Sequence, residues 1–210
     1  MVLRNFKFSI HDENIDIHIE DTNANKHGCH TWKCNEVLAN YLINNRNLIQ
    51  NKTILELGSG TGLSGILCCK LNASLVYLTD IKDEEVFINL HENCTRNNII
   101  NYKIFPITWG NLFQENLSLI NHLDIIIASD CLFKKSVFES FFITVAYFLR
   151  KHPNAILLTT FEIRWSSFDF DVYLDKYDLD ATEIPLGTFF DSNNELDQEI
   201  LLYSIKYIPN

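Results

Sequence analysis

The sequence of 210 residues lacks the marks of several protein classes. Its six cysteines form no Cys-x-x-Cys pair, so they predict reduced core or surface thiols and neither a disulfide framework nor a thiol redox motif. No apolar run reaches the roughly 18 residues of a membrane-spanning helix. Residues 1–8 alternate in polarity, unlike the apolar core of a signal peptide. We therefore expect a soluble intracellular protein, in the cytoplasm or the nucleus, without a membrane partner.

Positive charge is also scarce, because 17 Lys and Arg residues stand against 27 Asp and Glu residues, for a formal net charge of −10. A protein with this net charge has no excess of positive charge to replace the counterions around a nucleic acid, so we expect no direct nucleic-acid partner. The imbalance is uneven: residues 161–199 hold 11 acids and two bases, whereas residues 1–160 hold 16 acids and 14 bases. The acidic C-terminal third favours a basic protein or peptide as partner, although most surface acids only solvate a protein.

The first 30 residues predict a hairpin added to the main domain. Apolar and polar residues alternate around Phe6 and Phe8 and again around Ile15 and Ile17, on either side of the polar stretch 11–14. In residues 31–210 no change of composition, repeat or linker separates a second domain. Since 47% of the residues are hydrophobic, this part can bury one sizeable core. We expect one domain and a monomer.

The middle of the chain predicts an α/β fold. A helix over Trp32 to Ile49 precedes a regular alternation of short apolar strands and helices. The expected strands lie at Thr53 to Leu57, Ser74 to Thr79, Lys103 to Thr108, Asp124 to Ala128 and Ala155 to Thr160. The expected helices between them lie at Leu63 to Leu71, Asp83 to Asn97 and Val137 to Lys151. Strands that are apolar on both faces and separated by helices indicate a doubly wound, Rossmann-like parallel sheet with right-handed crossovers.

The C-terminal segment predicts an antiparallel end to this sheet. A helix over Phe168 to Tyr177 is followed by a strand near Ala181 to Pro185 and a last strand over Ile200 to Ile208. We interpret the connection between the last two strands as the short link of a hairpin. The expected sheet is therefore mostly parallel, with a C-terminal antiparallel strand.

The most informative stretch runs from Ile54 to Leu63, where a strand leads into three alternating glycines and then into a helix. Glycine allows a positive φ angle and leaves no Cβ in the way, so a ligand can lie against backbone N–H groups at the helix N-terminus. We expect Gly58, Gly60 and Gly62 to hold a nucleotide-like cofactor. The alternative is a tight strand-to-helix turn without a ligand.

Asp80 ends the next strand about 20 residues further on, where its carboxylate can accept hydrogen bonds from both hydroxyls of a ribose. Its alternative role is to cap the following helix. Residues 60–65 also match the dinucleotide pattern G-x-G-x-x-G. Three features favour S-adenosylmethionine over NAD: Glu56 inside the first strand, the pair Gly58-Ser59, and a length that leaves no room for a further substrate domain.

Four motifs in order carry a resemblance to a known family. They are Glu56 to Leu63, Thr31-Trp32 before the first long helix, Thr108-Trp109-Gly110 after the third strand, and Ala128 to Phe133 after the fourth. From about residue 30 to the end, the chain resembles the seven-strand S-adenosylmethionine-dependent methyltransferases and, within them, the family-16 protein methyltransferases. It departs from them at Lys33, where the family commonly has proline, and at Phe133, where the family often has tyrosine.

The resemblance implies a seven-strand fold, S-adenosylmethionine as cofactor and a set of cofactor-binding residues. That set is Trp32, Glu56, Gly58, Gly60, Gly62, Asp80, Trp109 and Ala128. Glu56 is placed to meet the ammonium group of the cofactor, directly or through water, and the glycines admit its methionine portion. Trp109 is expected to cover the adenine face. For Trp109 and Trp32 the alternative is an ordinary core tryptophan.

Methyl transfer needs mainly the alignment of a nitrogen lone pair behind the sulfonium methyl group. Asp130, at the end of the fourth strand, is the leading candidate for contact with the acceptor, its alternative being to cap the helix near Ser136. Phe133 either walls the acceptor channel or belongs to the core. Glu162 either shares a substrate guanidinium with Asp130 or pairs with Arg164.

The expected function is therefore methyl transfer to an arginine or lysine side chain of a basic protein such as a histone. The stretches Leu123 to Phe133, Tyr147 to Pro153 and Phe161 to Phe189 are most similar to a family member reported as a histone arginine methyltransferase. Two alternatives stay open, a non-catalytic cofactor-binding adaptor and an NAD-linked oxidoreductase. The residues His27, Cys29, His30 and Cys34 lack the spacing of a structural zinc site, so we expect no metal and interpret residues 26–34 as a substrate-entrance loop.

Overall fold

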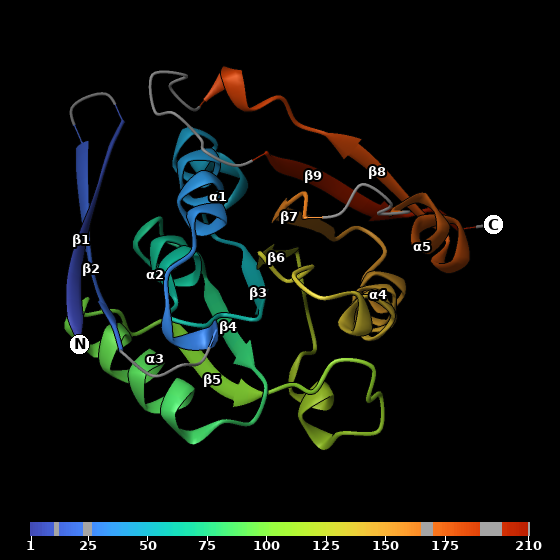
Figure 1. The fold of residues 1–210 in the computed structure, drawn as a ribbon, viewed down its shortest axis with the longest axis horizontal. Coiled ribbons are helices and arrows are strands. Elements are labelled where there is room, and N and C mark those ends of the chain that lie inside the picture. Colours follow the sequence, from blue (N-terminus) through green and yellow to red (C-terminus); the bar gives the residue numbers. More distant parts are fainter. Residues whose placement is uncertain (11–12, 23–26, 165–169, 190–198, 210) are drawn as a thin grey trace.

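A seven-stranded sheet forms the centre of the molecule (Figure 1). The computed structural model describes residues 1–10, 13–22, 27–164, 170–189 and 199–209. Across the sheet the strands follow the order β5 (Tyr102–Pro106), β4 (Leu75–Asp80), β3 (Thr53–Leu57), β6 (Ile125–Ser129), β7 (Ile156–Glu162), β9 (Ile200–Tyr207) and β8 (Leu179–Glu183). Strands β3 to β7 are parallel, and β9 runs antiparallel to both β7 and β8. The expected Rossmann-like sheet with a C-terminal antiparallel strand is confirmed.

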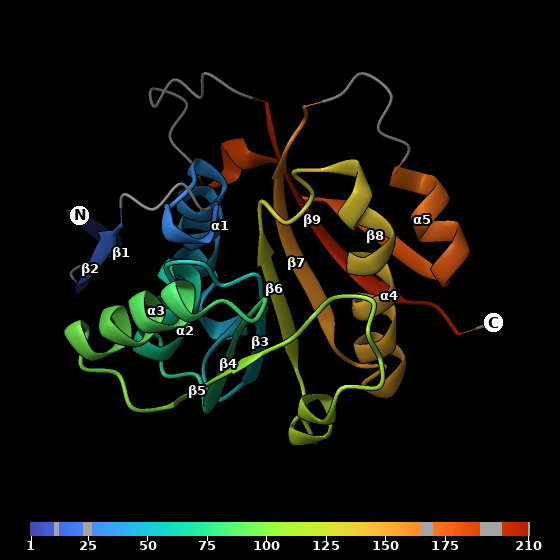
Figure 2. The ribbon, with the colours of Figure 1, turned by 60° about the horizontal axis from the view of Figure 1, so that its bottom comes forward.

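Helices cover both faces of this sheet (Figure 2). They are α1 (Lys33–Asn44), α2 (Leu63–Lys70), α3 (Glu84–Arg96), α4 (Lys135–Lys151) and α5 (Phe170–Tyr177). Because successive strand residues point to opposite faces, Ile54 packs in the core under α1 and α2, whereas Leu55 packs under α4. Burial on both faces explains why these strands read as continuous apolar runs. Among the described residues, no helix combines the length and the apolar character needed to cross a membrane.

Two features of the sequence-based fold need correction. The first helix ends at Asn44, because the Asn45 side chain donates to the Tyr41 carbonyl oxygen (2.9 Å) and a separate 3-10 turn, Arg46–Leu48, follows. The connection between β8 and β9 is residues 184–199 and not a short hairpin link, although the two strands are antiparallel as expected. Residues 168–169 of the expected fifth helix and residues 11–12 of the expected hairpin turn lie outside the described residues.

The N-terminal hairpin forms a separate two-stranded sheet of β1 (Val2–Ile10) and β2 (Glu13–Asp21). Two asparagines of α3 bind the backbone of β2: Asn93 exchanges two hydrogen bonds with Glu20, and Asn97 exchanges two with His18. Four residues of a helix rise about 6 Å and two residues of a strand about 6.6 Å, so the spacing of Asn93 and Asn97 along α3 matches the spacing of Glu20 and His18 along β2. The asparagines thereby satisfy the strand edge and dock the hairpin onto the domain.

Candidate functional site

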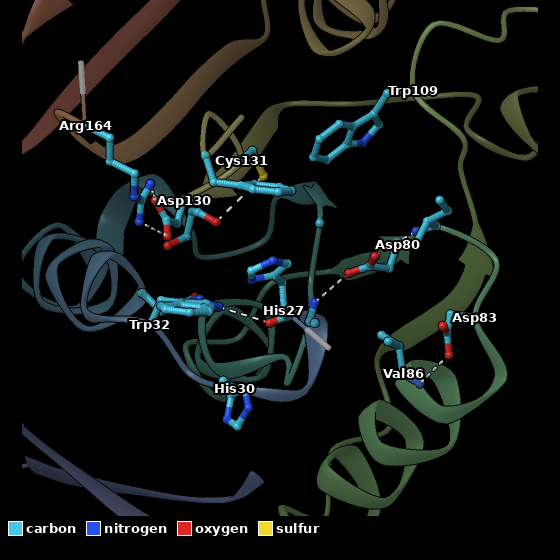
Figure 3. A pocket seen from close by; sticks show the side chains of 17 residues that line it. His27, His30, Trp32, Asp80, Asp83, Val86, Trp109, Asp130, Cys131 and Arg164 are labelled. Carbon is cyan, nitrogen blue, oxygen red and sulfur yellow. Dashed lines mark hydrogen bonds and ion pairs between the residues drawn. The ribbon is translucent and has the colours of Figure 1, made fainter. Parts of the chain in front are cut away.

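A cavity of about 540 Å³ opens beside the carboxyl ends of the parallel strands (Figure 3). Its wall combines the loop after β3, the ends of β4 and β6, Trp109, the segment before α1 and Arg164 beyond β7. Parallel strands bring their carboxyl ends to the same edge, which is why residues far apart in the sequence meet here. The volume lies in the range of roughly 300–1,000 Å³ that is usual for small-molecule sites.

The glycine loop borders this cavity with two of its three glycines. Gly58 and Gly60 lie on the cavity wall, with φ angles of 68° and 52°. A Cβ on Gly58 would lie 2.9 Å from the Sγ atom of Cys131, so the missing side chain also allows the loop to pack on the protein. Gly62 does not line the cavity. A Cβ there would lie 2.5 Å from Leu90 Cδ1, and its role is the close approach of α2 and α3.

Asp80 presents its carboxylate to the cavity at the end of β4. One oxygen accepts from the Gly60 N–H (2.8 Å) and the other from the Ile81 N–H (2.7 Å), which ties the strand end to the glycine loop. Burial raises the pKa of the Asp80 carboxyl group. Its alternative role as a helix cap is wrong, because Asp83 caps α3 by accepting from the Glu85 N–H (3.0 Å).

Glu56 lies inside the protein and not on the cavity wall. Its side chain is 1% exposed, and its Oε2 atom has no hydrogen-bond partner. A Cβ on Gly65 would lie 2.5 Å from that atom, so a glycine is required for α2 to pass so close. Burial raises the pKa of the Glu56 carboxyl group to about 8. An orphaned carboxyl oxygen beside the glycine loop fits a site for a cationic cofactor. We expected Glu56 to meet the ammonium group directly or through water, and its absence from the cavity wall does not favour the direct contact.

The two predicted tryptophans both line the cavity. Trp109 packs edge-on against Phe141, with ring centroids 5.3 Å apart, and its buried Nε1 atom has no partner. It therefore belongs to the core and to the cavity wall at once. Trp32 is 39% exposed and donates from Nε1 to the His27 carbonyl oxygen (3.0 Å), so its alternative role as a core tryptophan is wrong.

Asp130 turns away from the sheet directly after β6. Its φ angle of 53° lies in the left-handed region, which aspartate tolerates better than most residues. Its N–H donates to the Thr160 carbonyl oxygen (2.8 Å), so the backbone stays bound to β7 while the carboxylate reaches the cavity. Asp130 does not cap α4, which begins at Lys135 with Lys134 in the N-cap position. A non-glycine residue held in this conformation at a cavity edge is typical of a functional position.

Asp130 and Glu162 converge on one cation, the guanidinium of Arg164. Its Nη1 and Nη2 atoms lie 2.6 and 2.8 Å from the two oxygens of Asp130, and Nη2 lies 2.7 Å from Oε2 of Glu162. Figure 3 shows this side chain at the cavity edge beside Asp130. The hydrogen bonds to Asp130 raise the pKa of Arg164. The alternative role of Glu162, pairing with Arg164, is therefore observed, and the guanidinium that Glu162 shares with Asp130 belongs to Arg164 and not to a substrate.

The remaining wall residues come from the segment before α1, from α1 itself, from the region between β4 and α3 and from the end of β6. His27 packs against Phe133 (5.3 Å between ring centroids) and against Trp32 (5.9 Å), and His27, Gly28 and His30 line the cavity. Phe133 is a wall residue, whereas Ala128 is fully buried within β6. In the part of the chain that the structure describes, no three His, Cys, Asp or Glu residues are grouped to hold a metal ion.

Several residues of this wall were not predicted as site residues, among them Asn35 and Arg164, which was considered only as a partner of Glu162. Arg164 stands two residues after Glu162, the spacing that places two side chains on one side of an extended chain, and this signal was available. Asn35 offered no signal, because its place depends on the packing of α1, where its side chain accepts from the Ser64 hydroxyl (2.9 Å).

Comparisons with known proteins agree with this geometry. The profile described as "Lysine methyltransferase" matches residues 11–174. The chain is 32% identical to "Histone-arginine methyltransferase METTL23" of Xenopus laevis over 81% of this chain and 72% of the relative, and 30% identical to the Homo sapiens protein of that name over 82% and 90%. It is 31% identical to "Protein N-terminal and lysine N-methyltransferase EFM7" of Cryptococcus neoformans over 56% of this chain and 42% of the relative.

Solved structures share the fold at low sequence identity. The YcgJ protein of Bacillus subtilis superposes with a TM-score of 0.65 and 11% identity, covering 83% of this chain and 100% of that one. A SAM-dependent methyltransferase of Aquifex aeolicus gives 0.60 and 14%, covering 83% and 94%. These structures confirm the fold, and the profile and the relatives confirm the family resemblance. The chain belongs to the lysine methyltransferase family and is an S-adenosylmethionine-dependent protein methyltransferase.

Proposed function

We propose that this protein methylates a nitrogen of an arginine side chain in a basic protein segment such as a histone tail. The convergence of Asp130 and Glu162 on the guanidinium of Arg164 carries the proposal, because it is a site already shaped for that group. Two charge-assisted hydrogen bonds to Asp130 and an ion pair with Glu162 follow the planar fork of a guanidinium, which an ammonium cannot reproduce. The names of the relatives with 30–32% identity, which are histone-arginine methyltransferases, support the same acceptor.

The cofactor would occupy the cavity beside the glycine loop. Gly58 and Gly60 would receive its methionine portion, Asp80 its ribose, and Trp109 its adenine. When bound, S-adenosylmethionine supplies an electrophilic methyl group on a sulfonium centre. Glu56 lies behind this wall and would not contact the cofactor directly, since its carboxyl group is buried beside Gly65 of α2.

The acceptor carboxylates have two tasks in this proposal. A guanidinium is protonated at any physiological pH, since its pKa exceeds about 12, so a nitrogen lone pair becomes available only when the positive charge is drawn to the other nitrogens. Asp130 and Glu162 would hold those nitrogens and localise the charge there. Methylation adds one carbon to the free nitrogen and displaces one proton from it, which a carboxylate or a water molecule receives. Phe133 and Trp32 would exclude other water from the nitrogen.

Lysine is a second candidate acceptor, since the matched family is described as lysine methyltransferases and one relative carries lysine methylation in its name. An ammonium needs only one carboxylate, and Asp130 alone would suffice for it. The two acceptors differ in a measurable way. An arginine acceptor depends on both Asp130 and Glu162, whereas a lysine acceptor depends mainly on Asp130.

The acidic surface supports a basic partner. Within the predicted acidic segment, Asp171, Asp175 and Glu183 are exposed on α5 and β8, while residues 165–169 and 190–198 lie outside the described residues. Exposed carboxylates on a protein raise the rate at which it encounters a cationic segment, and salt weakens this effect by screening. A histone acceptor would place the protein in the nucleus during its reaction.

The test is transfer of a labelled methyl group from S-adenosylmethionine to matched peptides whose only basic residues are arginine or lysine. We expect label on the arginine peptide. Asp130→Ala should lower turnover by about 100-fold or more, a loss of about 2.7 kcal/mol of transition-state stabilisation, and change S-adenosylhomocysteine affinity by less than about threefold. Asp178→Ala is the matched control, because Asp178 also binds an arginine, Arg150 (2.8 Å), far from the cavity wall. Label on neither peptide, or equal turnover of Asp130→Ala, would contradict the proposal.

A further inference from the structure

Arg164 occupies the position that the proposed function assigns to the substrate. Its guanidinium takes both oxygens of Asp130 and one oxygen of Glu162 at 2.6–2.8 Å. The Asp130 side chain is 5% exposed and that of Glu162 17%, so little of either carboxylate remains for another cation. A second guanidinium therefore cannot bind in the same way while Arg164 stays.

We propose that Arg164 is an internal pseudosubstrate, which the incoming arginine side chain must displace from Asp130 and Glu162. This inference rests on the proposed function, since it uses the same pair of carboxylates as the acceptor site. It adds that Arg164 and the substrate arginine compete for the same two carboxylates. The Arg164 guanidinium occupies the site when no substrate is present, and the substrate guanidinium replaces it on binding.

The charges explain why such an occupant is needed. Two carboxylates at the edge of an apolar cavity repel each other and lose hydration, and a buried carboxylate without a cation is strongly destabilised. Arg164 supplies one positive charge, which leaves the group of three side chains with a formal charge of −1. Exchange for a substrate arginine keeps this charge count unchanged. The main electrostatic cost of opening the site is therefore offset by the substrate itself.

The position of Arg164 makes exchange possible without unfolding the sheet. β7 ends at Glu162, and the backbone of Ile163 is still held by a hydrogen bond to the Glu199 carbonyl oxygen (2.9 Å). Arg164 lies beyond this last pairing, and its side chain is 24% exposed at the cavity wall. Rotation about its side-chain bonds can move the guanidinium into water while Asp130 and Glu162 keep their places on the sheet.

Competition has a defined effect on affinity. When only a small fraction of molecules is open, the apparent dissociation constant is the intrinsic constant divided by that fraction. An open fraction of about 10% or less makes removal of the internal guanidinium tighten binding by about tenfold or more. A purely structural Arg164 predicts the opposite, because its loss would disorder Asp130 and weaken binding.

The experiment measures binding of the arginine-only peptide by calorimetry, in the presence of S-adenosylhomocysteine, to the wild type, to Arg164→Ala and to Arg150→Ala. Arg150→Ala is the matched control, since it also removes an arginine from a carboxylate, that of Asp178. We expect Arg164→Ala to bind the peptide about tenfold more tightly and Arg150→Ala to bind it like the wild type. We also expect millimolar ethylguanidinium to raise the melting temperature of Arg164→Ala and not that of Arg150→Ala, with methylammonium as the ionic control.

Unchanged or weaker peptide binding to Arg164→Ala would overturn the inference, whatever ethylguanidinium does. If Arg164→Ala does not fold, Arg164→Gln, which keeps much of the side-chain length and lacks the charge, is measured and judged in the same way. The two proposals fail separately. Tighter binding without any methyl transfer would contradict only the proposed function, whereas methyl transfer to arginine with unchanged affinity of the variant would contradict only the pseudosubstrate.

Discussion

Replacement of Glu56 by glutamine tests the electrostatic account of the site's interior. The ordinary pKa of this group is 4.5, and burial raises it to about 8 in the folded protein. Between these values the folded protein keeps a proton that the unfolded chain has lost, so the free energy of unfolding falls as the pH rises through this window and levels off above it. Relative to low pH, the raised pKa of Glu56 lowers the free energy of unfolding by about 4 kcal/mol at pH 8 and by about 1 kcal/mol at pH 5. Because glutamine cannot ionise, the free energy of unfolding of Glu56→Gln does not fall with pH for this reason.

The assay is urea unfolding of Glu56→Gln and the wild type at several pH values from 5 to 8. The variant should gain about 3 kcal/mol relative to the wild type between the two ends of that range. Glu92→Gln is the matched control, because this exchange on α3 makes the same chemical change at an exposed carboxylate. A stability difference between Glu56→Gln and the wild type that stays constant with pH would refute the reasoning.

Two further predictions concern packing. Gly62→Ala should destabilise the protein by about 1–3 kcal/mol in urea unfolding, since the φ angle of Gly62 is 88° and the new Cβ would overlap Leu90. The control is Gly187→Ala, where the space is open, and it should change stability by less than about 0.5 kcal/mol. Equal effects of the two substitutions would argue against the overlap. Asn97→Ala should lower stability by about 1–3 kcal/mol and speed hydrogen exchange at the His18 amide, and unchanged exchange there would show that the hairpin docks by other contacts.

The order of the elements could be predicted because each strand is short, apolar on both faces and followed by a helix. Thr53–Leu57 was predicted to the residue, and the other central strands were displaced by one or two residues. The position of β9 between β7 and β8 was not predictable from periodicity. It depends on pairing between strands that are distant in the sequence, and local sequence does not indicate which strands pair.

The cavity could be predicted in part, for a physical reason. Gly58, Gly60, Asp80 and Asp130 stand at strand ends, and the topology of a parallel sheet brings strand ends together. Orientation is a different matter. Glu56 lies on a strand, but whether its side chain faces the cavity or the interior depends on how closely α2 passes, and that distance is visible only in three dimensions.

The pairing around Arg164 shows the limit most clearly. Sequence spacing indicates that Glu162 and Arg164 can interact, and sheet topology places Asp130 nearby. That one guanidinium is shared by both carboxylates depends on side-chain geometry. The competition between chain and substrate was therefore absent from the sequence-based expectations, although both of its carboxylates were among them.

If the cavity beside the glycine loop binds S-adenosylmethionine, its product S-adenosylhomocysteine should bind there as well. Calorimetric titration of S-adenosylhomocysteine into the wild type and into Asp80→Ala measures this binding, with NAD as the competing ligand. We predict one site for S-adenosylhomocysteine, an affinity at least about tenfold weaker in Asp80→Ala, which is a loss of about 1.4 kcal/mol, and no heat with NAD. Binding of NAD without any response to S-adenosylhomocysteine would contradict the account.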